Sequence, residues 1–349
     1  MNSNLLKTLL ASALITLPGI AGAARWNNDN DAKLPQSSRR VVMMGNSITE
    51  YWQWHDVNNH KEFFADNGAL DRGIAAEKTP SMVRRFQADV IDMRPLVVVI
   101  GGGVNDINAK TPVDEVVANN AKMALAAVRL GIRPIMGTIN PSGWSFETVD
   151  RYKEYNRKIK AWCEENGFSF CDYFDAVKMN DTQYNEMKPE YRGRADHSDH
   201  LHPSRQGYIA MESVLIPLIE MNIWNNGSYE AEYAVKKGSG LTDVTLAAAS
   251  KDTYVKMASN ADTLKLGYNT QEAKGYSFTV TYTATKKGKL AILVNGQPVT
   301  VNVKATKGNF STATVTLNLN QGYNTIAVVN EGNTAVGVDK FGIANLRQR

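Results

Sequence analysis

Cysteine is scarce in this sequence: Cys163 and Cys171 are the only two among 349 residues. A chain of this size therefore cannot depend on a framework of disulfides for its fold. In an exported protein the two cysteines could form one disulfide that closes a short loop between a helix and the next strand. Two buried free thiols are the alternative, and the sequence favours neither.

Long apolar runs and clustered charge are also lacking. Beyond residue 25 no segment reaches the ~18 consecutive apolar residues of a membrane-spanning helix, so we expect no transmembrane segment. The formal net charge of +4 comes from scattered lysines and arginines without a basic run. Nucleic acid is therefore not an expected partner.

The first residues have the layout of a secretory signal peptide over 1–24. Lys7 precedes the mostly apolar run from Leu9 to Leu17, and small residues follow, with cleavage expected near Ala23 or Ala24. A buried N-terminal helix is the alternative. No cysteine stands at the cleavage point to accept a lipid. We expect an exported protein, periplasmic or secreted.

The length suits two domains, one of which can bury a large core. From Arg39 to Ile223 short apolar strands alternate with amphipathic helices. Strands are expected at 41–44, 69–72, 96–100, 134–138 and 168–173, and helices at 81–92, 113–130 and 149–166. Most of these strands are apolar on both faces, as in sheets covered on both sides. The pattern predicts a three-layer α/β domain with a parallel sheet over residues 25–224.

Helical periodicity is lost after Trp224. The stretch 225–228 is typical of a linker or tight turn, and YSFTVTYTAT then alternates apolar with polar residues. Asn295 and Gly296 suit a primed hairpin turn between two further strands. We therefore expect an all-β, jelly-roll-like sandwich over residues 229–349.

Ser47 follows the first predicted strand, in the segment MMGNSIT. In open α/β sheets, functional residues gather at the carboxyl ends of strands. A serine there has an exposed hydroxyl and a backbone N–H near a helix N-terminus, which suits a nucleophile whose own amide stabilises an oxyanion. A helix-capping serine is the alternative, and position alone favours it.

Three of the five histidines lie within ADHSDHLHPS, at His197, His200 and His202. Histidine and aspartate at short spacing are usual metal ligands, so a metal site is one interpretation. The other is an acid–base pair, because Asp199 stands three residues before His202, close enough to hold the imidazole by its Nδ1–H. Pro203 suits the first turn of a following helix over about 208–216.

Four segments resemble, in order, the signature blocks of the SGNH (GDSL-type) hydrolases. They are GNSIT at 45–49, the glycine of RGI at 72–74, GVND at 103–106 and DHLHP at 199–203. The resemblance spans about 39–223. It is closest to exported bacterial acylhydrolases whose first block continues as SITE plus an aromatic, here Tyr51.

The resemblance implies a serine esterase that needs no cofactor for catalysis. Ser47 would be the nucleophile, His202 the general base and Asp199 the carboxylate that orients it. The amides of Ser47 and Gly73 and the side chain of Asn105 would form the oxyanion hole.

This sequence departs from the family pattern at two places. The first block has Asn46 where aspartate is usual, which should alter local hydrogen bonding more than chemistry. The second block reads IAAEKT where relatives are richer in glycine, which puts the pocket near Gly73 in doubt. Arg72, Trp144 and His200 are further candidates for contact with substrate.

The ends of the predicted sandwich resemble those of jelly-roll carbohydrate-binding modules, some of which hold a structural calcium through opening glutamates, here Glu230 and Glu232. All six tryptophans precede this domain, so the commonest sugar-stacking platform is missing. A purely structural sandwich is the alternative.

Secretion and a glycan module favour an acetylesterase whose substrate is an acetylated polysaccharide. An acylhydrolase acting on lipids, thioesters or other small esters would use the same catalytic residues. A glycan-binding protein with a decayed hydrolase domain is disfavoured because every catalytic position is filled. Metal-dependent hydrolysis by the histidine cluster predicts loss of activity on chelation.

Overall fold

The computed structural model describes residues 26–332 and 334–346, so the signal peptide expected at 1–24 lies outside the described residues. The N-terminal part is built on a parallel sheet with strand order β2-β1-β3-β4-β5. Its strands are β1 (Val41–Gly45), β2 (Ala69–Gly73), β3 (Val97–Gly101), β4 (Arg133–Gly137) and β5 (Ser169–Cys171). The expected parallel α/β sheet is confirmed.

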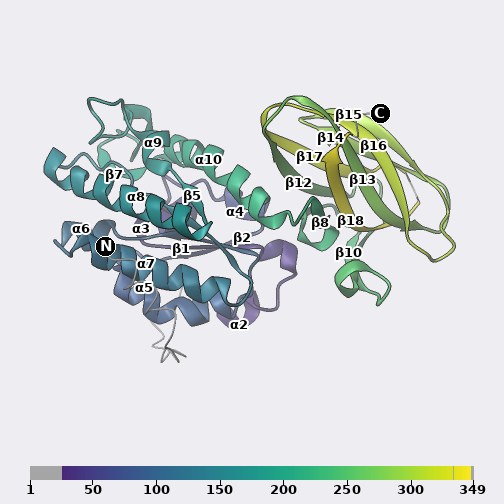
Figure 1. The fold of residues 1–349 in the computed structure, drawn as a ribbon, viewed down its shortest axis with the longest axis horizontal. Coiled ribbons are helices and arrows are strands. Elements are labelled where there is room, and N and C mark those ends of the chain that lie inside the picture. Colours follow the sequence, from purple (N-terminus) through teal and green to yellow (C-terminus); the bar gives the residue numbers. More distant parts are fainter. Residues whose placement is uncertain (1–25, 333, 347–349) are drawn as a thin grey trace.

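Helices cover both faces of this sheet (Figure 1). Val41 and Met43 of β1 pack in one apolar cluster with α3 (Ser47–Trp54), α4 (Glu62–Asn67) and α10 (Arg205–Ile223). Val42 and Met44 face the opposite way. They pack against α5 (Thr79–Phe86), α6 (Val104–Asn108), α7 (Val113–Val128) and α8 (Phe146–Asn166). Alternate residues of one strand thus enter two cores, which is the three-layer arrangement that the apolar strands predict.

Several short elements complete this part of the chain. They are α2 (Asn28–Asp31), α9 (Tyr173–Val177), the π-helical turn η2 (Gln87–Ile91) that continues α5, the 3-10 turns η1 (Gln36–Ser38) and η3 (Pro189–Tyr191), and the pair β6 (Arg192–Gly193) and β7 (Asp199–Pro203). The thiols of Cys163 and Cys171 are both buried and free. The sequence left open a disulfide or two free thiols, and the structure has the free thiols.

The C-terminal part is a sandwich of two antiparallel sheets. One has the order β10-β11-β18-β13-β16 with β8 beside β18, and the other the order β15-β14-β17-β12-β9. The strands are β8 (Ser228–Glu230), β9 (Val235–Lys237), β10 (Leu241–Thr245), β11 (Thr253–Met257), β12 (Thr263–Thr270), β13 (Lys274–Ala284), β14 (Gly288–Val294), β15 (Gln297–Val303), β16 (Ser311–Leu319), β17 (Gly322–Asn330) and β18 (Val336–Asn345), with η4 (Ala231–Tyr233) and η5 (Ser250–Asp252) between them. The expected all-β sandwich is confirmed.

Local sequence explains two turns of the sandwich. Asn295 and Gly296 have φ of 49° and 84°, as the primed turn between β14 and β15 requires. Asn226 and Gly227, with φ of 48° and 75°, form a similar tight turn at the start of this part.

The end of α10 packs against β12. Arg40 and Glu220 form a buried ion pair, and the second carboxylate oxygen of Glu220 accepts from the Gly267 N–H at 3.2 Å. The Trp224 indole N–H donates to the Gly267 carbonyl at 2.6 Å. Apolar residues of both parts belong to one continuous cluster, so the two are packed against each other. Within the described ranges, no helix has the length and apolar character needed to cross a membrane.

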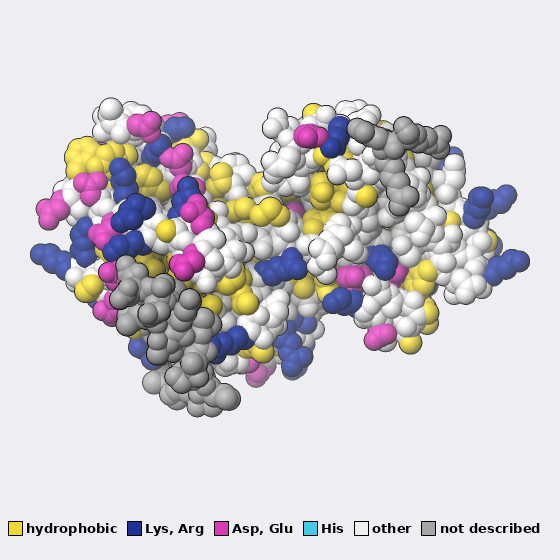
Figure 2. Space-filling model, in the orientation of Figure 1, with side chains coloured by type: hydrophobic (Ala, Val, Ile, Leu, Met, Phe, Trp, Pro, Cys, Tyr) yellow, Lys and Arg dark blue, Asp and Glu magenta, His cyan; other side chains and the backbone are white. Residues whose placement is uncertain are grey.

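Acidic and basic side chains are interspersed on the face drawn in Figure 2, especially over the α/β part. This distribution agrees with the scattered charges of the sequence.

Candidate active site

Ser47 is the first residue of α3, directly after the end of β1. Asn46 caps this helix, because its side-chain oxygen accepts from the Ile48 N–H at 3.1 Å. The capping function therefore falls to Asn46 and leaves the serine hydroxyl available. Ser47 is 6% exposed, at the point where the α3 N-terminus meets the carboxyl edge of the sheet.

His202 lies on β7 and reaches Ser47 across 155 positions of sequence. The distance from His202 Nε2 to Ser47 Oγ is 3.0 Å, within range for the serine hydroxyl to donate to the imidazole. The ring of Tyr51 packs against His202 with centroids 4.5 Å apart. Tyr51 lies one turn after Ser47, so α3 supplies both the hydroxyl and a wall for the imidazole.

Asp199 holds the other side of the imidazole. Its Oδ2 lies 2.9 Å from His202 Nδ1, and its Oδ1 accepts from the N–H groups of Leu201 and His202, each at 3.0 Å. Burial opposes ionisation of this carboxyl, but the hydrogen bonds from His202 and the backbone outweigh it and hold the pKa of Asp199 well below its ordinary value. The carboxylate is therefore ionised and fixes Nδ1–H toward itself, leaving Nε2 to face Ser47.

The helix after His202 begins later than Pro203 suggests. Pro203 ends β7, Ser204 caps α10 by accepting from the Gly207 N–H at 3.2 Å, and Arg205 is the first helical residue. The expectation that Pro203 starts the helix is wrong because a serine hydroxyl satisfies the first helical amides better than proline does. His202 consequently lies on a strand.

The other two histidines of this segment have different partners. His197 Nδ1 lies 3.0 Å from the Arg192 carbonyl, and His200 Nδ1 lies 3.7 Å from a carboxylate oxygen of Glu186. Of the three imidazoles, only that of His202 contacts Ser47.

The Gly73 N–H is already engaged. It donates to Asp71 Oδ1 at 2.7 Å, and Gly73 is buried. A Cβ at this position would collide with the backbone of Glu50, so the glycine allows β2 to approach α3 closely. The expectation that the Gly73 amide serves the oxyanion hole is therefore not supported by its hydrogen bonding.

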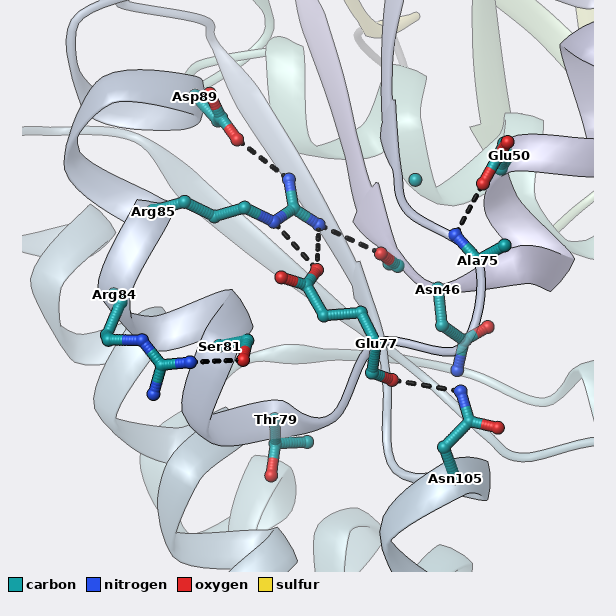
Figure 3. A network of polar contacts seen from close by, with 12 residues as sticks. Asn46, Glu50, Ala75, Glu77, Thr79, Ser81, Arg84, Arg85, Asp89 and Asn105 are labelled. Atoms are coloured by element: carbon teal, nitrogen blue, oxygen red, sulfur yellow. Dashed lines mark hydrogen bonds and ion pairs between the residues drawn. The ribbon is translucent and has the colours of Figure 1, made fainter. Parts of the chain in front are cut away.

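Asn105 and the turn after Gly73 lie together (Figure 3). The Asn105 side-chain amide donates to the Glu77 carbonyl at 2.9 Å, which leaves its second N–H for another acceptor. A turn closes from Ile74 to Glu77, with Ala76 exposed at a φ of 61°. The Ala76 N–H enters no backbone hydrogen bond with the described residues. Sequence reasoning missed Ala76, although a strained turn residue next to a signature block is the signal to look for.

Arg72 does not lie at the surface. It is 1% exposed, its guanidinium donates to Asp31 Oδ2 at 2.7 Å and to the Asp71 carbonyl at 2.8 Å, and it stacks over the Trp26 ring at 4.9 Å. These contacts with the segment around α2 bury the charge, so the structure gives no support to a contact between Arg72 and substrate.

The loop that carries Trp144 packs against His200. Trp144 is 50% exposed in the loop before α8, and its carbonyl accepts from Asn185 Nδ2 at 3.1 Å. Gly143 packs so closely on His200 that a Cβ there would meet the imidazole. The loop that carries the exposed Trp144 therefore contacts His200, which lies two residues before His202 on β7.

Carboxylates also gather in the sandwich, where β8 and η4 meet β18. Glu230 Oε2 and Glu232 Oε2 are buried without a hydrogen-bond partner, and Glu232 is 7% exposed. Burial, with Glu230 and nearby aspartates, raises the pKa of Glu232 to about 8. Considering only residues 26–332 and 334–346, no group of three or more His, Cys, Asp or Glu is arranged to hold a metal ion.

Parts of the chain are similar to known proteins. Residues 43–210 match the model of the GDSL-like lipase/acylhydrolase family. A GDSL-like lipase from Bacteroides thetaiotaomicron has 29% identity and a TM-score of 0.49, over 55% of this chain and 95% of its own. A family 35 carbohydrate binding module from Clostridium thermocellum has 22% identity and a TM-score of 0.32, over 34% of this chain and 97% of its own. No curated protein matches the chain.

The matched segment runs from β1 into α10, and so includes Ser47, Asp199 and His202. Residues 43–210 of the α/β part thus form a domain that matches the GDSL-like lipase/acylhydrolase family model. This match supports a hydrolase of ester bonds.

Proposed function

We propose that this protein is an exported serine esterase that removes acetyl groups from a polysaccharide. The observation that carries the catalytic part is the continuous chain from Ser47 Oγ through the His202 imidazole to Asp199, with steps of 3.0 and 2.9 Å. This order of groups activates a serine hydroxyl for attack on a carbonyl carbon.

In the first half-reaction Ser47 Oγ bonds to the carbonyl carbon while its proton passes to His202 Nε2. Asp199 stabilises the imidazolium that forms. The tetrahedral intermediate collapses as Nε2 returns the proton to the leaving alcohol oxygen, and the acyl group stays on Ser47. A water molecule then repeats the sequence, giving a carboxylic acid and free Ser47.

In this proposal three donors stabilise the negative charge that develops on the carbonyl oxygen. The Ser47 N–H lies at the N-terminus of α3, where backbone amides are unpaired and the helix dipole favours an anion. The second N–H of the Asn105 side chain is the next donor. The exposed Ala76 N–H, rather than the engaged Gly73 N–H, is the third in this proposal.

Support for a glycan substrate comes from the loop that carries Trp144 and from the sequence. Trp144 presents an exposed ring next to His200, and aromatic faces of this kind suit the apolar face of a sugar ring. The signal-peptide pattern at 1–24 and the sandwich fit an enzyme that meets polysaccharide outside the cell.

The test is acetate release from a panel of acetylated xylan, pectin, mannan and peptidoglycan, together with a series of aryl esters of increasing chain length. We expect release from at least one polymer and a preference for acetyl. Trp144→Ala should raise KM for the active polymer and leave aryl-acetate turnover unchanged. A preference for chains of eight or more carbons, with no polymer cleaved, would favour a lipid acylhydrolase instead.

We also propose a calcium ion with a purely structural role in the sandwich. The unpartnered oxygens of Glu230 and Glu232 would supply two of the oxygen ligands of such an ion, which would remove the cost of their burial. The ion would tie β8 and η4 to β18. Calcium should raise Tm more at pH 9 than at pH 6, because Glu232 must lose its proton to ligate, and Glu232→Gln should abolish the rise. An equal rise in that variant would contradict the site.

A further inference from the structure

Arg85 is the centre of a buried polar network beside the candidate active site (Figure 3). It lies in the last turn of α5 with 10% of its side chain exposed. Its guanidinium donates through Nε to Glu77 Oε2 at 2.7 Å, through NH1 to Asp89 Oδ2 at 2.8 Å and through NH2 to the Gly45 carbonyl at 3.0 Å. NH2 also lies 2.6 Å from Glu77 Oε2.

Two of these contacts lead directly to the proposed catalytic groups. Gly45 is the last residue of β1, two positions before Ser47. Glu77 is the residue whose backbone carbonyl accepts from the Asn105 amide. One guanidinium thus joins the strand end that carries the nucleophile to the turn that holds the Asn105 side chain.

The turn is fixed on both sides of Ala76. On one side the Ala75 N–H donates to the Glu50 carboxylate of α3. On the other side, Arg85 is the one described residue that forms a hydrogen bond or ion pair with the Glu77 side chain. Glu77 is therefore the point at which the turn can be released while its contact with α3 remains.

Charge makes this arrangement dependent on Arg85. Burial raises the pKa of Glu77, and the hydrogen bond and charge of Arg85 are the main opposing influence. Asp89 adds to the rise, and the charge of Arg84 opposes it least. Without the guanidinium, two carboxylates with little access to water would face each other. Glu77 would then turn toward solvent, and its carbonyl would move away from Asn105.

We propose that Arg85 is a positioning residue for the ester hydrolysis: through Glu77 it holds the Asn105 amide, and through Gly45 the Ser47 strand end, in the geometry that stabilises the oxyanion. The inference rests on the proposed function of this site. It assigns Arg85 no contact with substrate, so its effect belongs in kcat rather than in KM.

The test compares Arg85→Gln with Arg84→Gln in the full-length protein, using an aryl acetate. Arg84 is a matched control because it is the neighbouring arginine of α5 and its guanidinium contacts only Ser81 among the described partners. A small misplacement of a catalytic group costs up to about 100-fold in rate, so we expect kcat to fall toward that value in Arg85→Gln with KM retained. Arg84→Gln should match the wild type.

A double-mutant cycle distinguishes positioning from general damage. If Arg85 acts through Asn105, Arg85→Gln should lower kcat much less in an Asn105→Ala background than in the wild type. Equal losses in both backgrounds, or wild-type kcat in Arg85→Gln, would overturn the inference. Loss of activity in Ser47→Ala within the same assay shows that the serine-dependent ester hydrolysis stands whichever result is obtained.

If Arg85→Gln does not fold, Glu77→Gln is the second variant that tests the same inference. It keeps the backbone carbonyl that Asn105 contacts and nearly the same side-chain shape, but it removes the ion pair with Arg85. We expect a fall in kcat that is again smaller in the Asn105→Ala background. An unchanged kcat in Glu77→Gln would contradict the inference.

Discussion

The two halves of the candidate active site differ in how they are held. The proton-relay half, Ser47, His202 and Asp199, is joined by direct side-chain contacts. The oxyanion half depends on backbone: the Gly73 N–H is turned to Asp71, and the Asn105 amide is held by a carbonyl of a turn. Side-chain identity therefore specifies the first half, whereas loop conformation specifies the second.

The largest effect should come from breaking the relay. Ser47→Ala removes the attacking oxygen and should lower kcat for an aryl acetate by roughly a millionfold, since loss of one relay member disables the whole unit. His202→Ala should be similar. Asp199→Asn should cost less, about 10⁴-fold, because the imidazole remains in place with its tautomer less well fixed. Steady-state kinetics measures all three, and full turnover in Ser47→Ala would refute the relay.

A smaller effect is expected from the oxyanion half. Asn105→Ala removes one donor and should cost about 3 kcal/mol of transition-state stabilisation, roughly 100-fold in kcat. KM should change little, because this hydrogen bond strengthens only as charge develops. Equal losses in kcat and in binding of a substrate analogue would show instead that Asn105 shapes the ground-state pocket.

The third prediction concerns the carboxyl that holds the Gly73 amide. Burial, with a contribution from Glu50, raises the pKa of Asp71 to about 8, although the Gly73 N–H opposes the shift. The native state then keeps a proton that the unfolded chain releases near pH 4, so the contribution of Asp71 to stability is complete below about pH 4 and is lost as pH rises to about 8. The slope is at most about 1.4 kcal/mol per pH unit.

Asp71→Asn can still accept from the Gly73 N–H but does not titrate. Between pH 6 and 8 the wild type should therefore lose more of its free energy of unfolding than the variant, as urea unfolding at each pH would measure. Parallel pH profiles would mean that Asp71 is ionised throughout. They would weaken the conclusion that a buried, protonated Asp71 engages the Gly73 amide.

The difference between side-chain identity and loop conformation also explains how much of the site the sequence could predict. Ser47, Asp199 and His202 could be singled out because their residue types and their positions at strand ends carry the signal, and the structure brings the three side chains into contact. Neither Gly73 nor Ala76 could be assigned in this way, because the direction of an N–H depends on backbone angles that residue type does not fix. The start of α10 was misplaced for a related reason: Pro203 was expected in the first helical turn, but Ser204 caps the helix after it.

Long-range contacts account for what else was missed. The sequence makes Arg72 a candidate for substrate contact, but in the fold its guanidinium is paired with Asp31 and lies over the Trp26 ring. The partners of Arg85 are 4, 8 and 40 positions away, and only the fold brings Gly45 to it. The parallel sheet and the sandwich were predictable because their apolar periodicity is repeated over many residues. A single long-range contact does not change such a pattern.

The smallest expected effect is a change in stability that tests the conformation of the turn from Ile74 to Glu77. Ala76 has a φ of 61°, a region that disfavours L-residues by about 1–2 kcal/mol relative to glycine. Ala76→Gly should therefore raise the free energy of unfolding, by about 0.5 kcal/mol after the greater freedom of glycine in the unfolded chain is subtracted. Ala75→Gly is the matched control, since Ala75 is also exposed and is not among the residues at positive φ. That variant should be less stable than the wild type, so the two substitutions are expected to have opposite signs in urea unfolding. The same sign in both would mean that Ala76 does not hold the left-handed conformation in solution, and the oxyanion half would then be shaped by a different turn from the one described.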